Sequence, residues 1–170
     1  MRESKEYNYM IREMKQSDII EVARIEADIF SDAWSEKSLM ESLNQKHVKM
    51  IVAEKNLAIA DAPRVDGYVI FYMAGEEGDI ARVAVSLDSR RRGIADRLLE
   101  NIWKFCEKTS ICRVLLEVRE SNDSAIQLYK KHGFEELGMR KNYYSDPLEN
   151  GVIMEKQIDI TTSNSEILSI

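Results

Sequence analysis

The sequence predicts a mixed α/β fold, with one central sheet of about seven strands and about four flanking helices. The main observation behind this prediction is an alternation of strand and helix patterns in the middle of the chain. A strand pattern over Asp79–Val85 precedes a helix pattern over Gly93–Lys108, and a further strand pattern follows over Arg113–Val118. Strands joined through a helix run parallel, whereas the outer strand patterns have short, hairpin-like connections.

The second observation is the size of the chain. Its 170 residues fit one domain, and the 44% that are apolar are enough for one sizeable core. We assign residues 1–158 to this domain. Residues 159–170 are expected to form a flexible tail, as the first eight residues do.

The chain is predicted to begin with a strand and two helices. Tyr9–Met14 alternates loosely, and Ser17 or Asp18 is placed to cap the first helix, with Glu21 at capping-box spacing from Asp18. A second, short helix is expected from Ser35. The apolar face of the first helix is predicted to contain Ile20, Val22, Ala23, Ile25, Ile29 and Phe30.

Two strands then precede the central unit. Val48–Glu54 and Val65–Ala74 are rich in Val, Ile, Tyr and Phe, which is typical of strands, and they are expected to pair antiparallel across a loop containing Pro63. A turn at Gly75 and Gly78 is predicted to lead into the next strand.

The C-terminal part is predicted to contain one helix and two strands. Asn122 or Asp123 is placed to cap this helix, and Gly133 is placed to end it. The last two strands are expected over Glu135–Met139 and Gly151–Gln157.

Composition and charge disfavour several classes of function. A net charge of −6 disfavours a nucleic-acid partner, and no apolar run is long enough to cross a membrane. The charged N-terminus leads into no apolar segment, so no signal peptide is expected and the predicted location is cytoplasmic. Cys106, Cys112, His47 and His132 show no metal-ligand spacing, so we expect no metal, and we expect both thiols to be reduced and buried.

A predicted phosphate-binding loop is the strongest functional signal. The strand ending at Val85 is followed by Arg90-Arg91-Arg92-Gly93-Ile94-Ala95, which has the pattern Arg-x-x-Gly-x-Ala at the start of a helix. The first N–H groups of a helix have no partner within the helix and carry the positive end of its dipole. Three adjacent arginines on an acidic protein repel one another unless an anion is near. The pattern therefore favours a site for a diphosphate over a solvated surface run.

These residues resemble the acetyl-CoA signature of the GNAT (GCN5-related N-acetyltransferase) superfamily. Further similarity to the RimI-type members, and to the related Ard1-type enzymes, lies in Leu116–Asn122, Ala125–Tyr129, Gly133-Phe134 and the penultimate loop Arg140–Tyr144. The resemblance implies a GNAT-like fold and acetyl-CoA as co-substrate. It also implies an N-terminal α-amine of a protein as acceptor, either on a ribosomal protein or on nascent chains.

The resemblance assigns coenzyme contacts and catalytic roles to particular residues. Glu117 corresponds to the general base, Tyr129 to the general acid, and Asn122 to a coenzyme contact, although Asn122 is equally suited to be a helix cap. Expected coenzyme-binding residues are Val83, Ala84, Val85, Arg90, Arg91, Arg92, Gly93, Ile94, Ala95 and Asn122. Glu117 also stands out without the resemblance, because a strand buried on both faces should exclude a carboxylate. The structural alternatives for Glu117 are an edge or strand-end residue that points at solvent, or one paired with Arg82 or Arg113. The alternative for Tyr129 is a residue that is simply part of the core.

The acceptor side is less well determined. Phe30, Trp34, Tyr143 and Tyr144 are expected to line a peptide groove, although both tyrosines could instead cover a sheet edge. Ser31-Asp32-Ala33 lies between Phe30 and Trp34 and lengthens this turn relative to the RimI pattern. An α-amine with a pKa of 7.7–8.0 is roughly 10% neutral at pH 7 and suits a single carboxylate base better than lysine does. Transfer to lysine or small amines, and a non-catalytic acetyl-CoA-binding domain, remain the alternatives. The sequence does not determine the oligomeric state.

Overall fold

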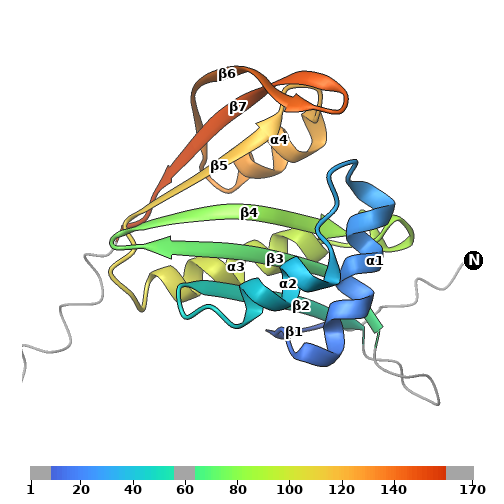
Figure 1. Ribbon diagram of the computed structural model, residues 1–170. Helices are drawn as coiled ribbons and strands as arrows, with labels where there is room; N and C mark the ends of the chain where they lie inside the picture. The colour runs from blue at the N-terminus through green and yellow to red at the C-terminus, as the bar shows by residue number, and fades with distance from the viewer. Residues whose placement is uncertain (1–8, 56–63, 160–170) are drawn as a thin grey trace, which may run out of the picture.

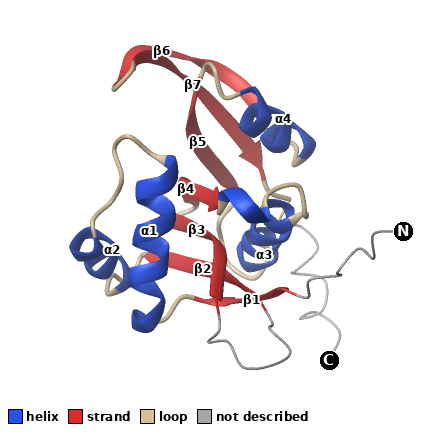
Figure 2. Ribbon diagram, turned by 90° about the vertical axis from the view of Figure 1, so that its right-hand side faces the viewer, coloured by secondary structure: helices blue, strands red, loops and turns tan. Residues whose placement is uncertain are grey.

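The computed structural model describes residues 9–55 and 64–159. Seven strands form one mixed sheet in the order β1-β2-β3-β4-β5-β7-β6, and helices cover both of its faces (Figures 1 and 2). The strands are β1 (Tyr9–Glu13), β2 (Val48–Lys55), β3 (Arg64–Ala74), β4 (Glu77–Val85), β5 (Arg113–Arg119), β6 (Glu135–Ser145) and β7 (Leu148–Gln157). The helices are α1 (Ile19–Ile29), α2 (Glu36–Leu43), α3 (Ile94–Cys106) and α4 (Asp123–Lys131), with short 3-10 helices at Gln16–Asp18 and Leu87–Ser89.

The predicted fold class is confirmed, and so is the parallel central pair. β4 and β5 run parallel on either side of α3, while the other neighbouring strands pair antiparallel. α2 begins at Glu36, one residue after the expected start, and Ser35 caps it, since its hydroxyl accepts the backbone N–H of Ser38 at 3.2 Å. The predicted loop around Pro63 and the predicted flexible ends, apart from Asp159, lie outside the described residues.

The predicted start of α1 is wrong in detail. Asp18 is at the N-cap position of α1, as predicted, but its side chain makes no capping hydrogen bond to the helix. Its carboxylate accepts the backbone N–H of Lys15 at 2.7 Å and pairs with Arg12 at 2.7 Å, which holds the preceding 3-10 turn. Val22 and Ile25 are buried as predicted, but Ile19 is buried in place of Ile20, which is 68% exposed.

Two predicted connections also differ. Gly78 lies within β4 and not in the predicted turn. A Cβ atom at Gly78 would lie 2.1 Å from the ring of Phe71. The strand therefore needs glycine there to make room for a core ring. β6 extends to Ser145, so Tyr143 and Tyr144 lie on a strand and not in the predicted loop. A short turn at Asp146 then connects β6 to β7.

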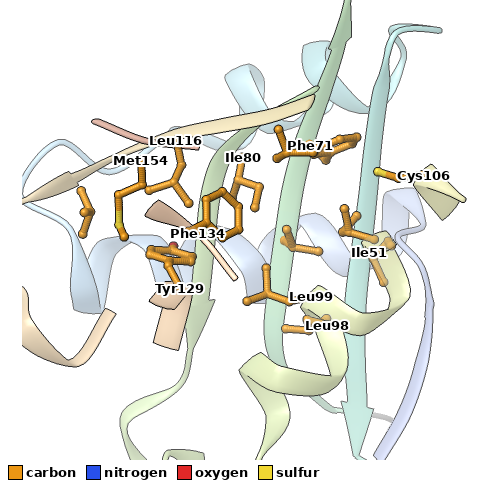
Figure 3. Close-up of a cluster of buried hydrophobic side chains, with 14 of the residues drawn as sticks. Ile51, Phe71, Ile80, Leu98, Leu99, Cys106, Leu116, Tyr129, Phe134 and Met154 are labelled. Carbon is orange, nitrogen blue, oxygen red and sulfur yellow. The ribbon is translucent and has the colours of Figure 1, made fainter. Parts of the chain in front are cut away.

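The core consists of two layers of buried side chains, one on each face of the sheet. One layer packs α1 and α2 against β2 and β3. The other packs α3 and α4 against the sheet, and Figure 3 shows Leu98, Leu99, Leu116, Tyr129 and Met154 within it. Fully burying one such aliphatic side chain contributes about 1.5–3 kcal/mol.

The two cysteines behave differently. Cys106 is a fully buried member of the second layer, and burial raises the pKa of its thiol to about 12. Cys112 is only half-buried, contrary to the prediction, and both thiols are free. None of the described helices is long and apolar enough to span a membrane.

Candidate active site

The central strands β4 and β5 separate and leave an opening in the sheet. Their pairing covers three residue pairs, from Glu77–Asp79 against Arg113–Leu115. Figure 1 shows the two strands diverging beyond this point. Residues 80–85 of β4 therefore have no strand partner on the side facing β5, and their backbone groups there can bond to a ligand. We call this opening the wedge; the predicted coenzyme-binding residues Val83, Ala84 and Val85 form part of its wall.

The predicted phosphate loop lies directly after this part of β4. Its arginines 90–92 are all exposed, and Gly93 is the N-cap of α3. Gly93 has a φ of +73° and Arg91 a φ of +62°, both in the left-handed region. A side chain at Gly93 would meet no atom within 4 Å, so the backbone conformation, rather than space, explains this glycine. The loop and the first N–H groups of α3 together form a positive, exposed helix N-terminus.

Asp66 on β3 holds this loop in position. Its carboxylate is 1% exposed and accepts the hydroxyl of Ser89 at 2.7 Å and that of Tyr9 at 3.1 Å. Its backbone carbonyl accepts the N–H of Ser86 at 2.8 Å. Buried carboxylates require such partners, so Asp66 fixes the path of the chain between β4 and α3. No sequence pattern marks this role, because its partners lie on β1 and in the loop.

Tyr129 and Glu117 lie on opposite faces of the sheet. Tyr129 is 8% exposed and packs edge-on against Phe134, at 5.6 Å between ring centroids, in the layer under α3 and α4. Burial, and then the nearby Tyr144, raise the pKa of Tyr129, so its phenol stays protonated at neutral pH. The tyrosine thus belongs to the core, as the structural alternative predicted, and still carries a proton that it can donate.

The reasoning that singled out Glu117 from burial is wrong. β5 is not buried on both faces but alternates, with Leu116 and Val118 buried and Glu117 half-buried on the other face. The Glu117 side chain is 21% exposed and pairs with Arg140 at 3.4 Å. The expected alternative partners are engaged elsewhere: Arg113 pairs with Glu77 and Glu155, and Arg82 pairs with Glu26 and Asp32.

A second carboxylate, which the sequence did not single out, accompanies Glu117. Asp79 on β4 is half-buried, and burial together with the negative charge of Glu117 raises its pKa to about 6, while Arg140 lowers it. Two carboxylates and one arginine therefore share this side of the wedge. The sequence offered no signal for Asp79, because its proximity to Glu117 depends on strand order.

Phe30 and Trp34 gather around Arg82. The Arg82 guanidinium lies over the ring of Phe30 at 4.3 Å and near that of Trp34 at 5.8 Å. It also pairs with Asp32, at 2.9 Å, in the lengthened turn between α1 and α2. The carboxylate of Glu26, which is fully buried near the end of α1, accepts the backbone N–H of Trp34 at 3.0 Å. The turn between α1 and α2 is therefore anchored to the sheet.

Tyr143 and Tyr144 form the other side of this region. Their rings are 5.0 Å apart; Arg140 lies over Tyr143 at 5.4 Å and Arg119 over Tyr144 at 4.3 Å. The pKa of Tyr143 is raised by burial and then by Glu117, which places this phenol beside the predicted base. Both tyrosines lie on β6, the edge strand of the sheet, so their role in a peptide groove stays a prediction.

Arg119 connects the two sides. It donates to the backbone carbonyls of Asp146, at 2.8 Å, and Pro147, at 3.1 Å, in the β6–β7 turn. Ser31 of the lengthened α1–α2 turn donates to the same Asp146 carbonyl. The four predicted acceptor residues thus lie on two segments that meet over this part of the sheet.

Asn122 serves as the N-cap of α4, with its side-chain oxygen accepting the N–H of Ala125 at 3.2 Å. The helix-cap alternative is therefore correct, and the coenzyme contact of Asn122 stays a prediction.

A parallel pair that opens beside a helix N-terminus, with a carboxylate and a buried phenol on either side, fits an acyl-transfer site. The sequence profile of the acetyltransferase (GNAT) family matches residues 19–134. This chain belongs to the acetyltransferase (GNAT) family.

The chain is similar over most of its length to particular members of the family. It is 32% identical over 145 residues to a Bacillus subtilis protein named as a candidate ribosomal protein bS18-alanine N-acetyltransferase, covering 85% of this chain and 92% of that protein. It is 28% identical over 152 residues to the Escherichia coli ribosomal protein bS18-alanine N-acetyltransferase, covering 88% and 98%. The crystal structure of the Escherichia coli enzyme superposes with a TM-score of 0.79 at 27% identity, covering 92% of this chain and 98% of that chain.

An archaeal structure is similar to the same extent. Ard1 from Thermoplasma volcanium superposes with a TM-score of 0.77 at 27% identity, covering 89% of this chain and 98% of that chain. The RimI-type and Ard1-type resemblance predicted from sequence is therefore confirmed.

Proposed function

We propose that this chain transfers the acetyl group of acetyl-CoA to the N-terminal α-amine of a protein. The observation that carries this proposal is the wedge, which has Glu117 on one face of the sheet and the protonated phenol of Tyr129 on the other. Relatives named for acetylating the alanine of ribosomal protein bS18 support a protein N-terminus as acceptor. That alanine terminus is therefore the first substrate to test.

Acetyl-CoA fits the wedge and the phosphate loop. Its diphosphate would accept hydrogen bonds from the backbone N–H groups at the start of α3, beside the exposed arginines 90–92. Its thioester arm would extend along the unpaired edge of β4, where backbone N–H groups of residues 83–85 can polarise the carbonyl. The thioester then lies between the two faces, where Glu117 and Tyr129 approach it from opposite sides.

Each protein group has one task in this reaction. Glu117 removes a proton from the α-ammonium, directly or through a water, and the neutral amine attacks the thioester carbonyl. The C–N bond forms and the C–S bond breaks, and the leaving thiolate takes the phenolic proton of Tyr129. The amide nitrogen then loses its extra proton, which returns the phenolate of Tyr129 to the protonated phenol. No cysteine or serine lies in a nucleophile motif, so we infer direct attack in a ternary complex.

The acceptor would lie between the α1–α2 turn and the β6–β7 hairpin. Phe30 and Trp34 on one side, and Tyr143 and Tyr144 on the other, offer aromatic surfaces with polar edges that suit a partly buried peptide. The hydrogen bonds of Arg119 and Ser31 to the β6–β7 turn would close the groove over the first residues of the acceptor. A cytoplasmic location stays a prediction.

The test is acetyl transfer to short peptides with free or blocked N-termini, with lysine-containing peptides and free polyamines in parallel. We expect only free N-termini to react, and we expect Glu117→Gln to lower kcat/KM about 10²- to 10⁴-fold. Glu100→Gln, the same change on the exposed face of α3, is the matched control and should retain full activity. Reaction of blocked peptides or polyamines alone would move the acceptor to lysine or small amines.

A further inference from the structure

Asp79 lies on the same face of the sheet as the predicted base. In the parallel pair, Asp79 of β4 is opposite Leu115 of β5, and Glu117 follows two residues later. Side chains two residues apart project from the same face of a strand, so Asp79, Leu115 and Glu117 share one face. Asp79 is the last residue of β4 that pairs with β5, so its carboxyl group lies at the point where the wedge opens.

The charged and titratable groups around Asp79 come from three strands. Glu117 of β5 and Arg140 of β6 act on Asp79 directly. Tyr143 of β6 responds to Asp79, Glu117 and Arg140 together. Tyr72 of β3 lies directly opposite Asp79, and its hydroxyl is bonded to Ser42 at 2.9 Å.

One arginine therefore faces two carboxylates. Arg140 is 3.4 Å from Glu117 and its side chain is 55% exposed, so water weakens its charge. With both carboxylates ionised, the cluster has a net negative charge and attracts a protonated amine. When the cluster holds one proton, Asp79 carries it, because burial and the negative charge of Glu117 raise the pKa of Asp79 to about 6.

We propose that Asp79 acts through Glu117 as the proton reservoir of the acetyl-transfer reaction, a role that rests on the proposed function. Glu117 takes a proton from the α-ammonium, and that proton passes through water to the Asp79 carboxylate as the neutral amine attacks. Asp79 then releases it to water once the product leaves. No electron transfer is involved, and one proton leaves per acetyl group moved, as the overall reaction requires. Asp79 is a positioning residue for this proton and does not touch the acetyl group.

The reservoir lowers the cost of deprotonating the acceptor. An ordinary glutamic acid has a pKa of about 4.3, far below the 7.7–8.0 of an α-amine. Burial and the charge of Glu117 raise the pKa of Asp79 to about 6, which is closer to the pKa of the amine. The proton is therefore held about 50-fold more favourably than on an isolated carboxylate, which sets the scale of the expected loss on removing Asp79.

The test is the pH dependence of kcat/KM between pH 5 and 9 for wild type, Asp79→Asn, Asp79→Glu and Asp28→Asn. Asp28 is exposed on α1 and makes the change a matched control. We expect the wild-type rate to fall below about pH 6. Asp79→Asn should lower the plateau about 10- to 50-fold and move the acidic limb to lower pH, since the carboxyl group that titrates near pH 6 is removed. Asp79→Glu should restore most of the plateau.

The outcomes separate this proposal from the proposed function. An Asp79→Asn profile that keeps the wild-type plateau, or loses it with the limb unmoved, overturns the reservoir and leaves the N-terminal acetyltransferase standing. If no peptide reacts, the proposed function fails. The coupling between Asp79 and Glu117 is then tested by a measurement that needs no enzymatic activity. In that test, ¹³C-carboxyl NMR of the full chain should show Asp79 titrating near pH 6 and shifting to lower pH in Glu117→Gln. An Asp79 titration midpoint that Glu117→Gln leaves unchanged would refute the coupling between the two carboxyl groups.

Discussion

Replacing Asp79 by asparagine should make the fold more stable at neutral pH. The pKa of Asp79 is raised from 3.8 to about 6, first by burial and then by Glu117. The folded protein therefore binds this proton more tightly than the unfolded chain, and stability falls as pH rises between about 4 and 6. A shift of this size corresponds to at most about 3 kcal/mol, and partial exposure to water reduces this to about 1–2 kcal/mol. Asparagine has no charge to destabilise.

The assay is urea unfolding at unit steps from pH 4 to pH 8, for wild type, Asp79→Asn and the Asp28→Asn control. We expect Asp79→Asn to gain about 1–2 kcal/mol over wild type between pH 4 and pH 7, with the gain levelling off above pH 7. Asp28→Asn should show no such trend. A difference between Asp79→Asn and wild type that is constant across this range would show that Asp79 is not held in a costly ionised state.

Three further predictions concern glycine contacts and the phosphate loop. Gly78→Ala should destabilise the fold by about 1–3 kcal/mol in urea unfolding, because a Cβ atom would lie 2.1 Å from the buried ring of Phe71. Gly151→Ala should raise KM for the peptide more than for acetyl-CoA, because its Cβ would lie 3.0 Å from Tyr143 and displace that ring. Asp66→Asn should raise KM for acetyl-CoA several-fold in steady-state assays with little change in KM for the peptide, because the phosphate loop loses its charged anchor. An unchanged KM for acetyl-CoA would show that the loop keeps its conformation without the Asp66 carboxylate.

The sequence predicted the fold well where one pattern determined one element. The helix from Gly93 and the strand from Arg113 have clear periods and clear ends, and both were found within a few residues. The detail at the start of α1 was not, because the Asp18 carboxylate holds a 3-10 turn through Arg12 and Lys15 and does not bond to the helix. The Arg12–Asp18 pair joins a strand to a turn, and no single-element pattern contains it.

The site shows the same division between local and non-local information. The positions of Glu117 and Tyr129 came from family resemblance, but the argument from burial failed because β5 has one open face. Asp79, Arg140 and Asp66 matter through neighbours on other strands. Their proximity follows from the order β3-β4-β5-β7-β6, which the sequence did not determine.

The charge of the wedge follows from which arginines are already occupied. Arg82 lies on β4 near the acceptor residues, but its guanidinium pairs with Asp32 at 2.9 Å and lies 3.7 Å from the fully buried Glu26. Those two acids more than offset its single positive charge on the α1 side of the groove. Arg140 is then the arginine that opposes Asp79 and Glu117, and it balances one of the two. The remaining negative charge matches the single positive charge of a protein N-terminus, so the acceptor itself would complete the neutral cluster on binding.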